Sequence, residues 1–276
     1  MLCLFTECIQ LVKNPGQYWY IAGETNTGCA LFLLGGHETR LEIEFLDFNI
    51  DCESDGLLSI IDGWEMNYEL FPSLEDLPRD INKYRYCGLK RPRRKFVSSQ
   101  NAALINYYTP KKGQGFSIRV KFISNPFPCN VISIENSGTY TLRNYGLRMN
   151  CSISIIYPEV VNVLSVNIGT TSTGNSIDFL QRPSWYHRSN EIGKVRKTPS
   201  MKFSSQCMTQ NGGNYFELKT GDGLDPKYMI HRTKTMCGNF QRQYRPGVLL
   251  GCGNSVVRMR KLTLYTTGIV ESAPCE

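Results

Sequence analysis

Eleven cysteines constrain the fold of this 276-residue chain more than any other feature of its sequence. They are spread along the whole length, and even the closest neighbours, Cys3 and Cys8, do not form the C-x-x-C pair that zinc ribbons and redox motifs require. Spread-out cysteines in a chain rich in tyrosine, phenylalanine and glycine indicate disulfides that link short strands. We therefore expect an all-β, disulfide-stapled protein that is secreted into an oxidising, extracellular compartment.

The spacing of the cysteines indicates that one module occurs twice. Cys8 and Cys29 lie 21 positions apart, and Cys129 and Cys151 lie 22 positions apart near mid-chain. A strand-like apolar run follows the second cysteine of each pair. Cys3, the odd cysteine, is expected to belong to a leader remnant. Pairing within each module predicts five bridges, although a sequence alone leaves other connectivities open: Cys8 with Cys29, Cys52 with Cys87, Cys129 with Cys151, Cys207 with Cys237, and Cys252 with Cys275.

Alternating apolar residues predict short strands in both modules. Leu41, Ile43 and Phe45 are separated by glutamates, which is the period of a strand with one face in water. The closing strand of the second module, 256–265, is expected to match 116–122 of the first. The predicted strands are 16–21, 29–34, 41–45, 57–61, 102–107, 116–122, 160–168, 215–218 and 256–265.

The junction between the modules is expected at Phe127-Pro128. This boundary gives an N-terminal domain of residues 1–126 and a C-terminal domain of residues 127–276. The second module is longer because a polar, basic segment at about 181–205 separates two of its cysteines, and we interpret this segment as an exposed insertion.

The sequence lacks the motifs of several functional classes. The three histidines, His37, His187 and His231, lie in polar contexts, and H-E-x-x-H, G-x-S-x-G and phosphate-binding glycine loops are absent. We expect neither catalysis nor a cofactor. The net charge of +7 is modest for this length, which argues against nucleic-acid binding. No apolar run reaches the roughly 18 to 20 residues of a membrane span.

Three acidic residues form a weak candidate for a calcium site. Glu44, Asp55 and Asp62 are candidates because calcium prefers several carboxylate and carbonyl oxygens. Exposure on a solvated strand face and capping of turns account for these three acidic residues without a metal. A further acid expected near Asn106-Tyr107-Tyr108 is missing. We therefore predict no metal at these positions.

A basic run and a sequon complete the motifs. Lys90–Lys95 holds five cations in six residues, and their repulsion keeps the run exposed. Single-stranded nucleic-acid sites have aromatic residues among their cations, and this run has none. The run is explained as a solvated loop, as an acidic-ligand contact or as a protease cleavage site, since Arg91-Pro92-Arg93-Arg94 resembles a convertase recognition sequence.

Asn150-Cys151-Ser152 is an N-glycosylation sequon, so Asn150 is expected to carry a glycan.

The order of short strings in the chain resembles a known extracellular family. Cys52-Glu53-Ser54-Asp55 and the strand and turn from Leu57 to Gly63 resemble a CUB domain, which is a β-sandwich. More narrowly, the chain resembles an invertebrate member of the corticotropin-releasing factor-binding protein family. The matching strings recur in family order from about Cys8 to Tyr265: Asp62-Gly63-Trp64, Phe71-Pro72-Ser73, Ser98-Ser99-Gln100-Asn101, Phe127–Ser133, Asn150–Pro158, Gly223-Leu224-Asp225-Pro226 and Asn254–Met259.

The resemblance implies two tandem CUB-like antiparallel β-sandwich domains of the jelly-roll type, with the five bridges above and a glycan on Asn150. It also implies a secreted, non-enzymatic carrier that sequesters peptide hormones of the corticotropin-releasing factor, urocortin and diuretic-hormone class and limits receptor activation. Three departures from the family pattern bear on which peptide is bound. Gln10 stands where the family has an acid, the insertion is longer and more basic, and the C-terminal tail is shorter.

A peptide carrier needs an exposed apolar surface. We hypothesise that Trp19, Trp64 and Tyr68 contribute to a groove for an extended or amphipathic-helical peptide, because these aromatic residues lie near turns. The alternative function is an extracellular CUB-type adaptor that binds a protein partner through a calcium-organised acidic site. A purely structural matrix protein is a third alternative.

Overall fold

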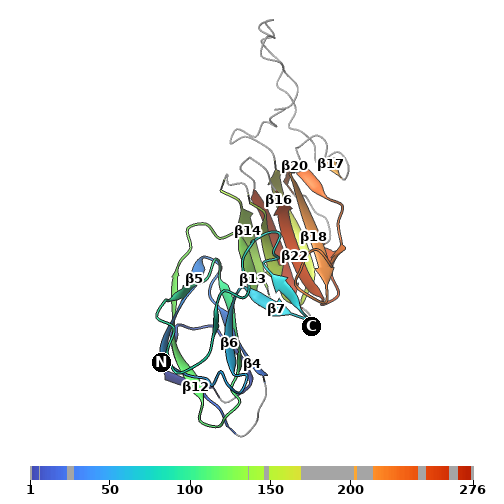
Figure 1. Cartoon of the computed structure of the whole chain (residues 1–276). Helices are drawn as coiled ribbons and strands as arrows, with labels where there is room; N and C mark the ends of the chain where they lie inside the picture. Colours follow the sequence, from blue (N-terminus) through green and yellow to red (C-terminus); the bar gives the residue numbers. More distant parts are fainter. Residues whose placement is uncertain are drawn as a thin grey trace, which may run out of the picture. The chain divides into compact units, whose positions relative to one another are not determined.

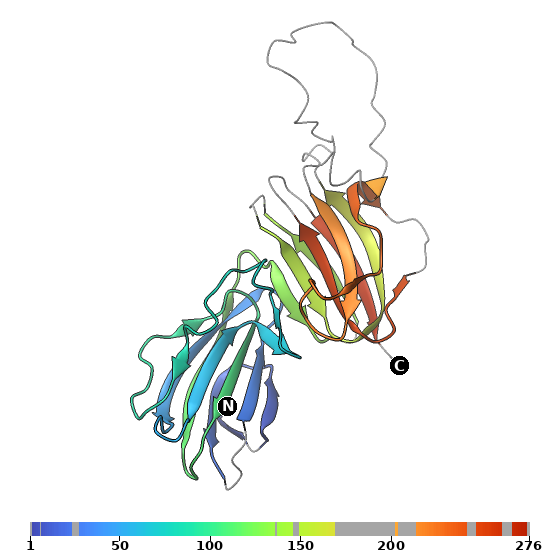
Figure 2. The same cartoon turned by 45° about the vertical axis from the view of Figure 1, so that its right-hand side comes forward.

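The computed structural model describes residues 2–5, 7–23, 28–135, 137–145, 149–168, 202–203, 214–241, 247–260 and 267–274. Every regular element in these ranges is a β-strand (Figures 1 and 2). No helix long and apolar enough to cross a membrane occurs in this described part of the chain. The expected all-β class is confirmed.

The described strands belong to two compact units, which consist of Met1–Ser133 with Gly223–Tyr228 and of Ile134–Asp222 with Met229–Glu276. The division between Ser133 and Ile134 falls later than the expected junction at Phe127-Pro128. The side chain of Asn101 explains the difference, because its amide donates to the Ile132 carbonyl at 2.8 Å and its oxygen accepts the Ile132 N–H at 3.0 Å. These two bonds hold the segment beyond the junction to the first unit.

The first unit is a sandwich of two five-stranded sheets, whose layers are visible in Figure 1. One sheet has the order β1 (Leu2–Phe5), β3 (Gly16–Ile21), β12 (Gly115–Ser124), β5 (Thr39–Asn49) and β10 (Phe96–Val97). The other has the order β2 (Ile9–Val12), β4 (Gly28–Leu34), β11 (Ala102–Tyr108), β6 (Leu57–Asp62) and β9 (Arg85–Tyr86). Neighbouring strands are antiparallel except β1 with β3 and β2 with β4, which are parallel.

The core of this unit follows from the period-two pattern of its strands. In β5, Leu41, Ile43 and Phe45 are buried in the cluster between the sheets, while the glutamates between them face outward. Tyr18 and Tyr20 of β3 also point into this cluster. Sequence alternation therefore decides which face of each strand is covered.

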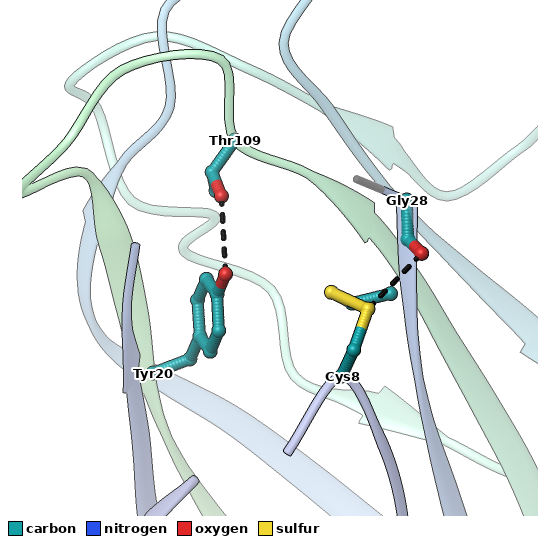
Figure 3. Close-up of a disulfide and its surroundings, with 5 residues drawn as sticks. Cys8, Tyr20, Gly28 and Thr109 are labelled. Carbon is teal, nitrogen blue, oxygen red and sulfur yellow. Dashed lines mark hydrogen bonds between the residues drawn. A yellow bond between two sulfur atoms is a disulfide. The ribbon is translucent and has the colours of Figure 1, made fainter. Parts of the chain in front are cut away.

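Two disulfides link segments of the first unit. The bridges Cys8–Cys29 and Cys52–Cys87, both expected from the spacing, are present. Figure 3 shows the first of them, with the Cys8 sulfur 3.2 Å from the Gly28 carbonyl oxygen. We regard this approach as a van der Waals contact, because an oxidised sulfur has no proton to donate. Each bridge restricts the unfolded chain over a loop of about 20 to 35 residues, worth roughly 3–4 kcal/mol in the chain-entropy model.

Gly63, at the turn between β6 and the β7 (Trp64–Met66)–β8 (Glu69–Phe71) hairpin, is required by two independent constraints. Its φ of +113° is disfavoured for residues with a Cβ, and a Cβ there would collide with the backbone oxygen of Phe71. We expect Gly63→Ala to lower the free energy of unfolding by about 3 kcal/mol or more. The matched control is Gly113→Ala, where φ is +82° but no atom lies within 4 Å, and the expected cost is about 1 kcal/mol. Urea unfolding measures both values, and equal costs would contradict the role of the collision.

The described strands from Asn130 onward belong to an eleven-stranded arrangement. The described strands follow the order β13 (Asn130–Ser133), β15 (Cys151–Ile155), β22 (Asn254–Arg260), β18 (Tyr215–Gly221), β20 (Met236–Gln241), β16 (Pro158–Ile168), β23 (Thr267–Pro274) and β14 (Gly138–Arg143). Three short strands pair beside this path: β17 (Lys202–Phe203), β19 (Ile230–His231) and β21 (Val248–Leu249). Strand β20 pairs with β18 through Met236 and with β16 from Gly238 onward, so it joins two layers.

The strand order repeats between the two halves, with one correction to the sequence prediction. The path β3-β12-β5 corresponds to β14-β23-β16, and the path β2-β4-β11-β6 corresponds to β13-β15-β22-β18. The strand of the 256–265 region is therefore the counterpart of β11, and the sequence prediction that it matches 116–122, which lies in β12, is wrong. The counterpart of β12 is β23, near the C-terminus, because it pairs with β14 and β16.

Four more cysteines of the described residues are disulfide-bonded: Cys129, Cys151, Cys237 and Cys252. The partners expected for the last two, Cys207 and Cys275, lie outside the described residues. The pairing of these cysteines stays a prediction. The expected insertion at 181–205 also lies outside the described residues, apart from Lys202–Phe203.

Candidate functional site

The two tryptophans of the expected peptide-binding patch lie on opposite outer faces of the first sandwich. Trp19 faces outward from β3, because its neighbours Tyr18 and Tyr20 both point into the core. Trp64 follows β6 and packs edge-on against Phe32 of β4, with a ring-centroid distance of 5.2 Å. Phe32 in turn faces outward from its own sheet, since its neighbours in β4 are core residues. One peptide-binding patch cannot contain both tryptophans.

Trp64 is a packing residue in this conformation. Only 5% of its surface is exposed, and its indole Nε1 donates to the Leu33 carbonyl at 3.1 Å. A buried indole with a satisfied N–H stabilises the sheet beneath it and leaves no surface for a ligand. The hairpin β7–β8 therefore acts as a cover for one end of the β4 sheet.

Tyr68, the third residue of the expected patch, is almost fully exposed to solvent. It forms the turn of the β7–β8 hairpin together with Asn67, because Met66 pairs with Glu69 and leaves two residues between the strands. Both turn residues have positive φ, 53° for Asn67 and 63° for Tyr68, as a type I′ turn requires. The side chain of Tyr68 is 97% exposed, so it contributes little to the stability of the fold.

An apolar strip lies on the same outer face of the β4 sheet, at its β2 edge. It consists of Ile9 and Leu11 of the edge strand β2, which are 67% and 45% exposed, and of the half-buried Ala30 and Phe32 of β4, of which Phe32 also contacts Trp64. Ile9 lies opposite Ala30 and Leu11 opposite Phe32 in the parallel register, so all four side chains point to the same outer face. Sequence reasoning missed Ile9 and Leu11, although the apolar run after Cys8 was an available signal.

The strip ends at an open sheet edge. Among the described strands β2 pairs with β4 alone, so the backbone groups along its other side are available to an added strand. Exposed apolar residues on an open edge favour binding of an extended peptide or of an apolar helix face. This combination makes the apolar strip the strongest candidate for a binding surface among the described residues.

Two of the three acidic candidates for calcium have separate partners. Glu44 accepts a hydrogen bond from Arg119 at 3.2 Å, and Asp62 accepts two from Ser99, at 2.8 and 3.0 Å. Asp55 lies in the turn before β6 with a φ of 61°. Burial raises the pKa of Asp62, and the hydrogen bonds from Ser99 oppose this shift. Within the described ranges no three His, Cys, Asp or Glu residues are grouped as a metal site requires.

The basic run lies between β9 and β10. Lys95 pairs with Glu42 at 2.9 Å, and this hydrogen bond raises the pKa of the lysine. Arg91 donates from Nη1 to the Phe45 carbonyl at 3.2 Å.

The sequon residue Asn150 is half-buried just before β15, while the next two residues are buried. Whether Asn150 carries a glycan stays a prediction.

The sequence of the chain matches known proteins along most of its length. Residues 4–124 match the family model described as the corticotropin-releasing factor binding protein N-terminal domain. The chain is 32% identical over 256 residues to corticotropin-releasing factor-binding protein of Xenopus laevis, covering 92% of this chain and 71% of the relative. It is also 32% identical to the Homo sapiens protein of the same name over 255 residues, 92% of this chain and 70% of the relative.

Among solved structures, the chain matches the CUB1-EGF-CUB2 domains of rat MASP-1. The identity is 11%, the TM-score is 0.31, and the match covers 96% of this chain and 99% of the other. A likeness at this level supports no conclusion about the arrangement of the chain.

Proposed function

The chain belongs to the corticotropin-releasing factor-binding protein family, and from this premise we propose that it is a secreted, non-enzymatic carrier of corticotropin-releasing-factor-like peptides. The peptide class would include urocortin-like and diuretic-hormone-like hormones. Binding to the carrier lowers the concentration of free peptide by mass action, and so limits receptor activation. The observation that carries this proposal is the 32% identity over 92% of the chain.

The apolar strip supplies a physical mechanism for peptide binding. Ile9 and Leu11 are already exposed, so covering them with apolar side chains of a peptide gains free energy without disturbing the fold. An extended segment would also hydrogen-bond to the open edge of β2, whereas an amphipathic helix would place its apolar face on the strip. Charged residues around the strip would affect the rate of encounter more than the affinity.

A titration of the purified full chain against a panel of such peptides tests the proposal. We expect at least one corticotropin-releasing-factor-like or diuretic-hormone-like peptide to bind with a Kd below about 1 μM, which corresponds to about −8 kcal/mol. Isothermal titration calorimetry measures the affinity, and a scrambled peptide of the same composition is the control. Only micromolar or absent binding across the panel would reject the carrier function.

Repeating the titration in EDTA separates the carrier from a calcium-organised adaptor. The separate partners of Glu44 and Asp62 predict that chelation leaves the peptide affinity unchanged. If EDTA abolished binding, calcium would be part of the site and the adaptor function would be favoured.

A further inference from the structure

The basic run Lys90–Lys95, called the basic loop below, presents an unusual density of uncompensated charge. Five of its residues are exposed in the loop that leads from β9 to β10, and Pro92 is half-buried. Like charges held this close repel one another, so the loop is stable only where solvent or an anion surrounds it. The neighbouring Leu89 is also exposed, at 80%.

The ion pairs of the described residues leave most of this charge unpaired. Lys95 lies 2.9 Å from Glu42 and 4.0 Å from Glu44, so its charge is largely compensated. Among the described residues, no carboxylate lies within ion-pair distance of the other four cations, which are Lys90, Arg91, Arg93 and Arg94. The loop therefore displays a net excess of four positive charges.

The basic loop is fixed at both ends. On its N-terminal side, Cys87 is bonded to Cys52, and Gly88 accepts a backbone hydrogen bond from Ile50 at 3.0 Å. On its C-terminal side, Phe96 is buried in β10 with 2% exposure. Arg91 adds a contact in the middle, to the Phe45 carbonyl. A loop that is held in this way loses less conformational entropy on binding than a free tail would lose.

We propose that the basic loop binds a linear sulfated polysaccharide. Lysine and arginine clustered in a short segment are typical of heparin-binding surfaces, because sulfate groups along a polysaccharide need closely spaced cations and no apolar pocket. Arginine also forms two parallel hydrogen bonds to an oxyanion, and three of the four uncompensated cations are arginines. The disulfides of this unit are typical of extracellular proteins, which meet such polysaccharides.

Other polyanions fit the basic loop less well. A lipid surface needs several apolar side chains that insert between headgroups. Next to the loop, the described residues offer the exposed side chain of Leu89 and the less exposed Val97, at 37%, in β10. Single-stranded nucleic acid needs aromatic side chains on which bases stack, and the run Lys90–Lys95 contains none.

The loop and the apolar strip belong to opposite edges of one sheet. Strand β9 precedes the loop and forms one edge, and β2, which carries Ile9 and Leu11, forms the other. Three strands lie between them. The structure thus permits the polysaccharide and a peptide to occupy separate surfaces of the same unit.

Retention of the full chain on immobilised heparin, eluted with a salt gradient, tests the proposal. The double variant Arg93→Ala/Arg94→Ala removes two exposed cations of the basic loop, and Lys13→Ala/Lys112→Ala removes the same charge elsewhere on the unit. We expect the loop variant to bind about tenfold or more weakly at physiological salt, and the control variant to change by less than about twofold. The slope of log affinity against log salt should fall by up to about 2 for the loop variant.

Three results on heparin would overturn the proposal. They are passage of the native chain through the heparin column without retention, equal shifts for the two double variants, and equally tight binding to chemically desulfated heparin. Tighter binding to vesicles of anionic lipid than to heparin would assign the loop to a membrane surface and would reject the polysaccharide. Unchanged thermal unfolding of the loop variant shows that any loss of binding does not come from misfolding.

Discussion

Replacement of Trp64 by alanine is expected to lower the free energy of unfolding by about 3–5 kcal/mol, the cost of removing a buried aromatic side chain. The indole is 5% exposed and packs on Phe32 at a centroid distance of 5.2 Å. Its loss also leaves the buried Leu33 carbonyl without the indole N–H. Urea unfolding followed by far-ultraviolet circular dichroism measures the effect, since the backbone amides dominate this signal and it survives the loss of one tryptophan.

The control for this prediction is Tyr68→Ala in the same hairpin. Tyr68 is 97% exposed, so its truncation should change the free energy of unfolding by less than about 0.5 kcal/mol. A Trp64→Ala protein that unfolds like the native chain but loses peptide binding would contradict the packing role. That result would instead restore Trp64 as a ligand contact.

Replacement of Ile9 and Leu11 by serine is expected to weaken peptide binding by about 10- to 100-fold, or about 1.4–2.8 kcal/mol. The physical reason is that two exposed apolar side chains no longer become covered when the peptide binds. Stability should change little, because both residues are already exposed in the free protein. Titration calorimetry with the tightest peptide of the panel measures the loss.

Ile21→Ser is the matched control for the apolar strip. Ile21 ends β3 on the other sheet and is 58% exposed, so the substitution makes a similar chemical change away from the strip. We expect the control to retain the native affinity within about twofold. Equal losses in the two proteins, or no loss in either, would place the peptide elsewhere, while the carrier function would still stand on the panel titration.

Short-range patterns were sufficient to predict many strands. The predicted segment 16–21 has the bounds of β3, and 57–61 differs from β6 by one residue. The alternation of apolar and polar residues within a strand is local, because successive side chains point to opposite faces. The spacing of cysteines was likewise sufficient for Cys8–Cys29 and Cys52–Cys87, since each bridge closes a module-sized loop.

Strand order was harder to predict than strand position. We matched the 256–265 region to 116–122 because both are closing apolar runs, yet β22 occupies the place of β11 in its sheet. A strand's apolar pattern is the same whichever neighbours it pairs with. Its place in a sheet depends on contacts with residues far away in the sequence, which an alternation pattern does not contain.

The candidate site separates what the sequence determined from what the tertiary structure decided. By itself the sequence determined an all-β chain, its main strands, its family and the exposed basic loop, because these depend on local patterns and motif order. The tertiary structure decided that Trp19 and Trp64 lie on opposite outer faces and that Ile9 and Leu11 form an exposed edge. The physical reason is that exposure depends on which sheet and which hairpin cover a residue, and those contacts form only when distant segments pack together.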